Sequence, residues 1–313
     1  MEMTKIAIQT ENLCCDFRNN IRAVDHLSLR VPKGIIFGLL GPNGSGKTTM
    51  IHLLLGLLKP SKGRAEVLGF DVLSQAAQIR CRTGALLEHS GLYERLSAED
   101  NLEFYGRVWR LPLAQRRTRI RELLSKIGLW ERRQERVGSW SRGMKQKLAV
   151  ARAMLHRPSM IFLDEPTAGL DPVAAAALRD DLTEMVTQEG VTVFLTTHNL
   201  AEAEKLCTLV GIIRQGKLLA VGHPDELRLG TGKLYVKIRG RGFNTQVLEL
   251  LLSVPKVSAA RIQNGHLLIH LNQKTDVAPL VSLLVEAGVQ VEEVHIGKAS
   301  LEKVFLTLMD EEQ

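Results

Sequence analysis

Two kinds of apolar pattern alternate along the first 230 residues of the chain. Short continuous apolar runs of buried-strand length occupy 34–40, 160–163 and 191–195, and each ends in glycine-rich or polar residues. Residues 48–58 and 172–188 instead have helical spacing. Buried strands that alternate with helices predict an α/β fold, with a parallel sheet that helices cover on both faces.

Two further segments, 4–10 and 26–31, alternate apolar and polar positions like edge strands, which indicates an additional antiparallel β subdomain. Residues 97–156 carry mostly helical periodicity, so we expect a helical subdomain at about 90–157. The apolar positions expected in its core are Leu102, Leu123, Leu124, Ile127, Leu148 and Val150.

A domain boundary is expected near Gly230-Thr231-Gly232, a stretch of small residues. This divides the chain into a domain at 1–230 and an accessory α+β domain at 231–313. The second domain has the predicted order strand, helix, hairpin, helix, strand, helix, and this βαββαβ order is that of a ferredoxin-like unit. The predicted ranges are 233–239, 244–252, 257–262 paired with 266–271 through Asn264-Gly265, 275–287, 290–296 and 299–309.

The composition excludes several classes of protein. The 313 residues are 45% hydrophobic and 24% charged, which is ordinary for a globular protein and too apolar for a disordered one. A membrane span needs ~20 apolar residues, and the N-terminus lacks the apolar core of a signal peptide. We therefore expect a cytoplasmic protein. Its four cysteines contain no Cys-x-x-Cys and are expected to be buried or free thiols.

The positive charge is concentrated in one segment. The formal net charge is +7, and 107–136 alone holds ten basic and three acidic residues. Such a segment either contacts anionic lipid headgroups or an acidic partner, or forms a solvated helix face. Nucleic acid is not expected as a partner, because the segment has only two widely separated aromatic residues, Trp109 and Trp130, and no recognised reading motif.

The strongest chemical motif follows the first apolar run. It matches G-x-x-x-x-G-K-[ST] and consists of Gly41, Pro42, Asn43, Gly44, Ser45, Gly46, Lys47 and Thr48. A predicted strand precedes it and a predicted helix follows, as a phosphate-binding loop requires. Backbone N–H groups would surround the phosphates of a nucleotide, Lys47 would contact the β- and γ-phosphates, and the Thr48 hydroxyl would bind Mg²⁺. We also assign the next residue, Thr49, to this site. The alternative is a flexible glycine-rich turn.

A second motif follows the strand predicted at 160–163. Asp164 lies at the carboxyl end of this strand, where an α/β sheet places a Mg²⁺-binding carboxylate. Glu165 is positioned to polarise an attacking water. A third motif, 140–146, precedes a helical run that stops at Pro158, and by itself Ser141 would be a plain N-cap.

Taken together and in order, these motifs resemble the ATP-binding cassette ATPases, specifically the nucleotide-binding subunits of export-type transporters. The resemblance covers 4–230 and rests on the phosphate loop at 41–48, the signature at 140–146, the acidic strand end at 160–165, the segment 168–171, and His198. The segment 299–305 is similar to the ending of many drug and antibiotic exporters of the family.

The resemblance implies roles for further residues and implies two partners. Phe17 would stack on adenine, Ser141 and the Gly143 backbone would bind the γ-phosphate held by the opposite protomer, Asp171 would bridge the dimer, and His198 would contact the γ-phosphate. Glu165, His198 and Lys47 would thus serve hydrolysis in a head-to-tail dimer with two ATP molecules. A separate integral membrane permease would hold this dimer at the cytoplasmic face of the cell membrane.

Two positions depart from the family pattern. Arg142 stands where the signature usually has a glycine, and Glu88 stands where the loop after the sheet core usually has a glutamine. Glu88 would still be able to ligate Mg²⁺, and the alternative is a plain loop acid. Phe17 as an ordinary core residue and His198 as a plain strand-end residue are likewise open alternatives.

Two other functions are consistent with a cassette ATPase. One is a nucleotide switch that acts on ribosomes or DNA, and the other is an importer subunit. The chain has one phosphate loop and no sustained heptads, unlike the usual switch proteins, and 299–305 favours export over import.

Overall fold

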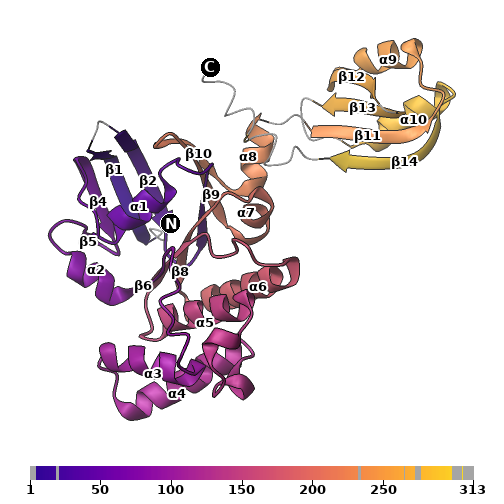
Figure 1. The fold of residues 1–313 in the computed structure, drawn as a ribbon. Coiled ribbons are helices and arrows are strands. Elements are labelled where there is room, and N and C mark those ends of the chain that lie inside the picture. The colour runs from indigo at the N-terminus through magenta and orange to yellow at the C-terminus, as the bar shows by residue number, and fades with distance from the viewer. Residues whose placement is uncertain are drawn as a thin grey trace. The chain divides into compact units, whose positions relative to one another are not determined.

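The computed structural model describes residues 5–18, 21–231, 234–263, 265–271, 276–297 and 305. The chain divides into two compact units, Met1–His223 and Pro224–Gln313 (Figure 1). The division falls at the start of α8 (Pro224–Thr231), so Gly230 and Thr231 of the expected boundary stretch lie at the end of this helix.

A six-stranded sheet with the order β10-β9-β3-β8-β7-β6 forms the centre of the first unit. The neighbouring strands β9, β3, β8, β7 and β6 pair in parallel, and β10 is antiparallel to β9. Every residue of β3 and β8 is buried, which confirms the prediction from the continuous apolar runs. The bounds are β3 (Ile36–Leu40), β6 (Thr83–Leu86), β7 (Met160–Asp164), β8 (Thr192–Thr197), β9 (Leu209–Arg214) and β10 (Lys217–Gly222). The carboxyl ends of β3, β7 and β8 therefore meet at one edge.

An antiparallel sheet, β2-β1-β4-β5, forms the expected β subdomain. Its bounds are β1 (Ile6–Phe17), β2 (Ile21–Pro32), β4 (Lys62–Val67) and β5 (Phe70–Asp71). The predicted ranges 4–10 and 26–31 were too short, because β1 and β2 each extend over 12 residues. Register shifts along their pairing interrupt the strict alternation from which a strand is predicted.

Helix α1 (Lys47–Leu54) follows the phosphate loop and ends earlier than the predicted range 48–58. Gly56 adopts φ +63°, and Leu57 beyond it is 51% exposed. A glycine in the left-handed region is a common helix terminator, so the apolar residues at 57 and 58 belong to the turn that leaves the helix.

The helical subdomain contains three helices and two 3₁₀ turns. All six apolar residues predicted for its core are buried, which confirms the helical periodicity. The bounds are α3 (Ala98–Val108), α4 (Leu113–Lys126), η1 (Trp130–Arg132), η2 (Val137–Ser139) and α5 (Arg142–Met154). The other helices of this unit are α2 (Ala76–Arg82), α6 (Pro172–Glu189) and α7 (Leu200–Leu206).

The basic segment 107–136 is not uniformly a solvated face. Arg116 and Arg119 on α4 are 8% and 3% exposed. Arg116 forms an ion pair with Glu103, and Arg119 donates to Glu189 at 2.9 Å. Acidic residues from α3 and α6 therefore compensate part of the charge excess that the sequence places in this segment.

The second unit has an antiparallel sheet with the order β12-β13-β11-β14. Together with helices α9 and α10, this order makes the predicted ferredoxin-like arrangement. The bounds are β11 (Leu234–Arg241), α9 (Thr245–Leu252), β12 (Val257–Gln263), β13 (His266–Leu271), α10 (Ala278–Glu286) and β14 (Gln290–Gly297). Asn264 of the predicted turn and, apart from residue 305, the helix predicted at 299–309 lie outside the described residues.

The cysteines are all free thiols; Cys14, Cys15 and Cys207 are buried, and Cys81 is exposed. Burial raises the pKa of the Cys207 thiol to about 12.

Across the described part of the chain, no helix has the length and apolar character needed to span a bilayer.

Candidate active site

The phosphate loop connects β3 to α1 and requires glycine at two of its positions. A Cβ on Gly41 would lie 2.4 Å from the Ile213 carbonyl oxygen, and one on Gly46 would lie 2.2 Å from that of Ala23. Gly46 also has φ +104°, which side chains disfavour. The loop therefore packs closely against the segments at Ile213 and Ala23. The α1 N-terminus that follows it carries unpaired N–H groups, which favour an anion.

Lys47 has its ammonium group fixed inside this loop. The side chain is 5% exposed, and Nζ donates to the carbonyl oxygens of Gly41 at 2.9 Å and Pro42 at 3.1 Å. Nζ also lies 3.3 Å from Oε1 of Glu165. Nearby, Oγ of Ser45 is buried and has no hydrogen-bond partner among the residues that the structure describes. A buried unpaired hydroxyl beside a fixed cation is suited to a phosphate oxygen.

Asp164 ends β7 and is connected to α1 and β8 by hydroxyl groups. Oγ1 of Thr48 donates to one carboxylate oxygen at 2.8 Å, and Oγ1 of Thr196 donates to the other at 2.5 Å. Thr196 also accepts from the Glu165 backbone N–H at 3.0 Å. Thr196 was not among the site residues expected from the sequence, although a polar residue at the end of an apolar strand is a usable signal.

Glu165 adopts φ +47°, a left-handed conformation that few residues other than glycine adopt. Its carboxylate lies between two nitrogen groups, because Oε1 faces Lys47 and Oε2 is 2.6 Å from Nδ1 of His198. Lys47, Glu165 and His198 come from α1 and from the ends of β7 and β8, so the parallel sheet brings together groups far apart in the sequence.

A cavity of about 330 Å³ opens beside these groups. Its lining consists of Asn43, Thr48, Leu86, Leu87, Glu88, Ser90, Arg142, Gln146, Asp164, Glu165 and Ala168. Glu88 thus shares a cavity with Thr48 and Asp164, and these hard oxygen donors are the kind that Mg²⁺ prefers. Ser141 is not part of the lining, although Arg142 next to it is.

Comparison with known proteins agrees with this geometry. Residues 24–168 match the family described as ABC transporter. The daunorubicin resistance ATP-binding protein DrrA3 of Streptomyces coeruleorubidus is 35% identical, over 93% of this chain and 92% of its own. The bacitracin transport ATP-binding protein BcrA of Bacillus licheniformis is 35% identical over 92% of both chains. The present chain belongs to the ABC transporter ATP-binding proteins.

The fold of this ABC ATPase is also that of solved structures. The structure of cbiO1 from Clostridium perfringens, part of the ABC transporter complex cbiONQ, has a TM-score of 0.68 at 23% identity. The match covers 80% of the present chain and 96% of the cbiO1 chain. The resemblance to export-type ATPase subunits is confirmed, because resistance and antibiotic-transport ATP-binding proteins are among the relatives.

The other residues singled out in the sequence of this ABC ATPase lie on two helix N-termini and one hairpin. Ser141 caps α5 and accepts from the Met144 N–H, and Asp171 caps α6 and accepts from two backbone N–H groups. Gly143 leaves no room for a side chain, since a Cβ there would lie 2.8 Å from that of Ala174. Phe17 is 43% exposed at the end of β1 and is not a core residue.

Replacing the newly found Thr196 with valine is expected to impair both stability and turnover. Thr196 is fully buried, so valine keeps the volume but removes the donor to Oδ1 of Asp164 and leaves the Glu165 N–H without its acceptor, while Thr48 still donates to the other oxygen of Asp164. Such unpaired groups cost about 1–3 kcal/mol in the free energy of unfolding. Urea denaturation and steady-state ATP hydrolysis would measure both effects. Thr196→Ser retains the hydroxyl and should restore turnover; equal loss in both variants would contradict the role.

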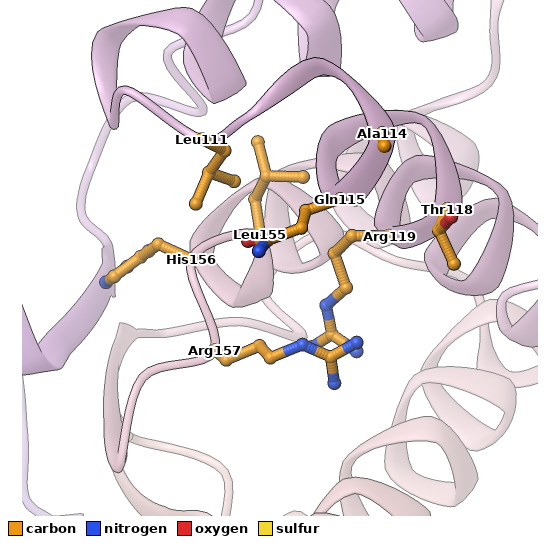
Figure 2. Close-up of a pocket in the computed structure, with 8 residues that line it drawn as sticks. All are labelled: Leu111, Ala114, Gln115, Thr118, Arg119, Leu155, His156 and Arg157. Atoms are coloured by element: carbon orange, nitrogen blue, oxygen red, sulfur yellow. The ribbon is translucent and has the colours of Figure 1, made fainter.

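A second cavity of this ABC ATPase, of about 450 Å³, lies in the helical subdomain and has no residue of the phosphate loop in its lining. Figure 2 shows the residues that line it. Its lining consists of Leu111, Ala114, Gln115, Thr118, Arg119, Leu155, His156 and Arg157. Both arginines are already paired, since Arg119 contacts Glu189 and Glu122, and Arg157 donates to Glu122 at 2.9 Å. This cavity therefore offers little uncompensated charge and none of the groups assigned to hydrolysis.

Proposed function

We propose that two copies of this ABC ATPase bind ATP and Mg²⁺ between them, head to tail, and that the cycle of closing and opening drives export through a separate membrane permease. The observation that carries the proposal is the convergence of Lys47, Glu165 and His198 at one sheet edge, while the signature residue Ser141 caps a different element. The names of the relatives DrrA3 and BcrA favour export over import or a ribosome-bound switch.

Lys47 and Glu165 would act in turn. In the structure the Lys47 ammonium faces Oε1 of Glu165. A γ-phosphate is more highly charged than a carboxylate and would attract this ammonium, which leaves Oε1 able to accept a proton from the attacking water. His198 would keep the carboxylate oriented through Oε2 and would reach the γ-phosphate with its other edge. Thr48, Asp164 and Glu88 would hold Mg²⁺, whose charge favours the developing phosphate.

The second wall of each ATP site would come from the partner copy. The N-terminus of α5, with Ser141 and the Gly143 N–H, has the donors and the dipole to bind a γ-phosphate. Asp171 lies at the start of α6 and would bridge the two copies. Phe17 is exposed and free to stack on the adenine ring. Two half-sites related by a two-fold axis would then enclose two ATP molecules.

A groove on the same unit has the chemistry to receive a helix of the permease. It has a volume of about 330 Å³ and is lined mainly by apolar groups of β6, α3, α5 and the turn that follows α1. Val108 at its side is 61% exposed and Leu57 is 51% exposed. An amphipathic cytoplasmic helix would cover these residues. This contact would hold the ATPase at the cytoplasmic face of the membrane.

The shared sites predict that ATP hydrolysis depends on dimer formation. We expect the turnover per protein molecule to fall on dilution, as the two copies separate. Hydrolysis measured across a dilution series, with the mass in solution followed by analytical ultracentrifugation, tests this. Full turnover by a protein shown to be monomeric at that concentration would contradict the proposal.

Mixing two inactive variants gives the matched control. Lys47→Ala removes the phosphate-loop wall and Ser141→Arg obstructs the signature wall, so each variant alone should be nearly inactive. A mixed dimer regains one intact site, and random pairing should restore about a quarter of the wild-type activity. Recovery of ATP hydrolysis in the mixture supports shared sites. If the mixture forms dimers normally but stays as inactive as the separate variants, the sites are not shared.

A further inference from the structure

The segment that carries Glu88 follows β6 and has few bonds of its own. Residues 88–91 form no backbone–backbone hydrogen bond with any residue that the structure describes. The Glu88 carboxylate likewise has no hydrogen bond or ion pair within the described ranges. Its place in the cavity beside Thr48 and Asp164 therefore depends on what holds the backbone on either side of it.

Two side chains of the helical subdomain hold this segment on both sides of Glu88. On α5, Nη2 of Arg152 donates to the carbonyl oxygen of Ala85 at 2.8 Å. On α3, the hydroxyl group of Tyr105 donates to the carbonyl oxygen of Gly91. Ala85 stands three residues before Glu88 and Gly91 stands three residues after it, so the two contacts bracket the carboxylate.

The two side chains also contact each other and leave no space at Gly91. The Arg152 guanidinium lies 5.1 Å from the centre of the Tyr105 ring, within the range of a cation–π interaction. Gly91 adopts φ +65°, and a Cβ there would lie 2.8 Å from Nη1 of Arg152 and 3.3 Å from the Tyr105 hydroxyl oxygen. The segment after Glu88 is thus packed directly against the Arg152–Tyr105 pair.

The arginine of this pair has no acidic partner. Arg152 forms no ion pair with a carboxylate among the residues that the structure describes, and its Nε atom is buried there without a hydrogen-bond partner. Arg116 and Arg119 of the same subdomain are instead paired with glutamates. A buried donor without a partner destabilises a folded chain, so its presence calls for a reason beyond packing.

We propose that Arg152 and Tyr105 are positioning residues that hold Glu88 at the Mg²⁺ site. Neither side chain lines the cavity that contains Glu88, so both act through the backbone of 85–91. A segment with few hydrogen bonds opens at a low free energy. Loss of one of the two contacts therefore allows the carboxylate to leave its place beside Asp164. This role rests on the Mg²⁺ contact proposed above for Glu88.

Removal of the Tyr105 hydroxyl group tests this role with a small change. Tyr105→Phe keeps the ring beside Arg152 and loses the bond to Gly91. Mn²⁺ is the probe: the full-length protein, saturated with a non-hydrolysable ATP analogue, is titrated with Mn²⁺, and the EPR signal of free Mn²⁺ gives the affinity. We expect Tyr105→Phe to weaken Mn²⁺ binding about 2- to 10-fold, the range that the net contribution of one hydrogen bond allows.

Tyr93→Phe is the matched control. Tyr93 lies in the same aromatic cluster, and its hydroxyl group has no hydrogen-bond partner in the described part of the chain, so Mn²⁺ affinity should stay at the wild-type value. The affinity for ATP in EDTA should be unchanged in Tyr105→Phe, because the pair does not contact the phosphate loop. Arg152→Lys keeps the charge but loses the planar group beside Tyr105, and as a second variant it should also weaken Mn²⁺ binding.

A double-variant cycle with Glu88→Ala decides whether the pair acts through Glu88. Glu88→Ala alone should weaken Mn²⁺ binding, and the addition of Tyr105→Phe should then have no further effect. Wild-type Mn²⁺ affinity in Glu88→Ala would refute the Mg²⁺ contact of Glu88, and the positioning role with it. If Glu88→Ala weakens binding but Tyr105→Phe and Arg152→Lys do not, or if the effect of Tyr105→Phe persists in full in Glu88→Ala, the positioning role alone is overturned.

Discussion

Replacing Glu165 with glutamine is expected to reduce ATP turnover by about 10²- to 10⁴-fold, the usual contribution of a general base. The amide keeps the size of the side chain and a contact to His198 but cannot take a proton from water. It also removes one negative charge beside the Lys47 ammonium. We therefore expect ATP to bind at least as well, and the ATP-bound dimer to accumulate.

Phosphate release and size-exclusion chromatography in ATP and Mg²⁺ measure both parts of this expectation. Glu184→Gln is a matched control, because it makes the same change at an exposed position of α6. Steady-state hydrolysis at the wild-type rate in Glu165→Gln would refute the assignment of Glu165. A slow variant that does not dimerise in ATP would retain the catalytic role and remove the link between hydrolysis and dimer opening.

Replacing Lys47 with alanine is expected to weaken ATP binding by about 10- to 100-fold, since a hydrogen bond to a charged group contributes about 1.5–3 kcal/mol. The loss has two causes. The phosphates lose their positive partner, and the carboxylate of Glu165 is left without the ammonium that faces it, so it repels the γ-phosphate.

Calorimetric titration with ATP measures this change in affinity. Lys59→Ala, at an exposed position after α1, should bind ATP like the wild type. Wild-type affinity in Lys47→Ala would count against the phosphate-loop role. Unfolding of both variants should be compared, because Lys47 also donates to the carbonyl oxygens of Gly41 and Pro42.

The central sheet and the phosphate loop were predictable because their signals are local. A strand buried on both faces needs a continuous apolar run, and a loop that closes on phosphate needs glycine where a Cβ would collide, as at Gly41 and Gly46. For β1 and β2 the sequence predicted only part of the length of each strand. Their irregular pairing removes the alternation that sequence reasoning uses.

The basic segment illustrates the opposite case. Its charge is plain in the sequence, but its surroundings are not, since Arg116 and Arg119 are buried against Glu103 and Glu189 from other helices. A carboxylate distant in the chain decides whether an arginine is a surface charge or part of an internal ion pair. Only the folded chain shows which applies.

By itself, the sequence determined which chemical groups are present for ATP binding and hydrolysis and in which order they follow the strands. The tertiary structure decided their partners: Lys47 and His198 on either side of Glu165, and Thr196 between Asp164 and the Glu165 N–H. The physical reason is that strand and loop propensities depend on neighbouring residues, whereas hydrogen bonds and ion pairs depend on which strands lie side by side.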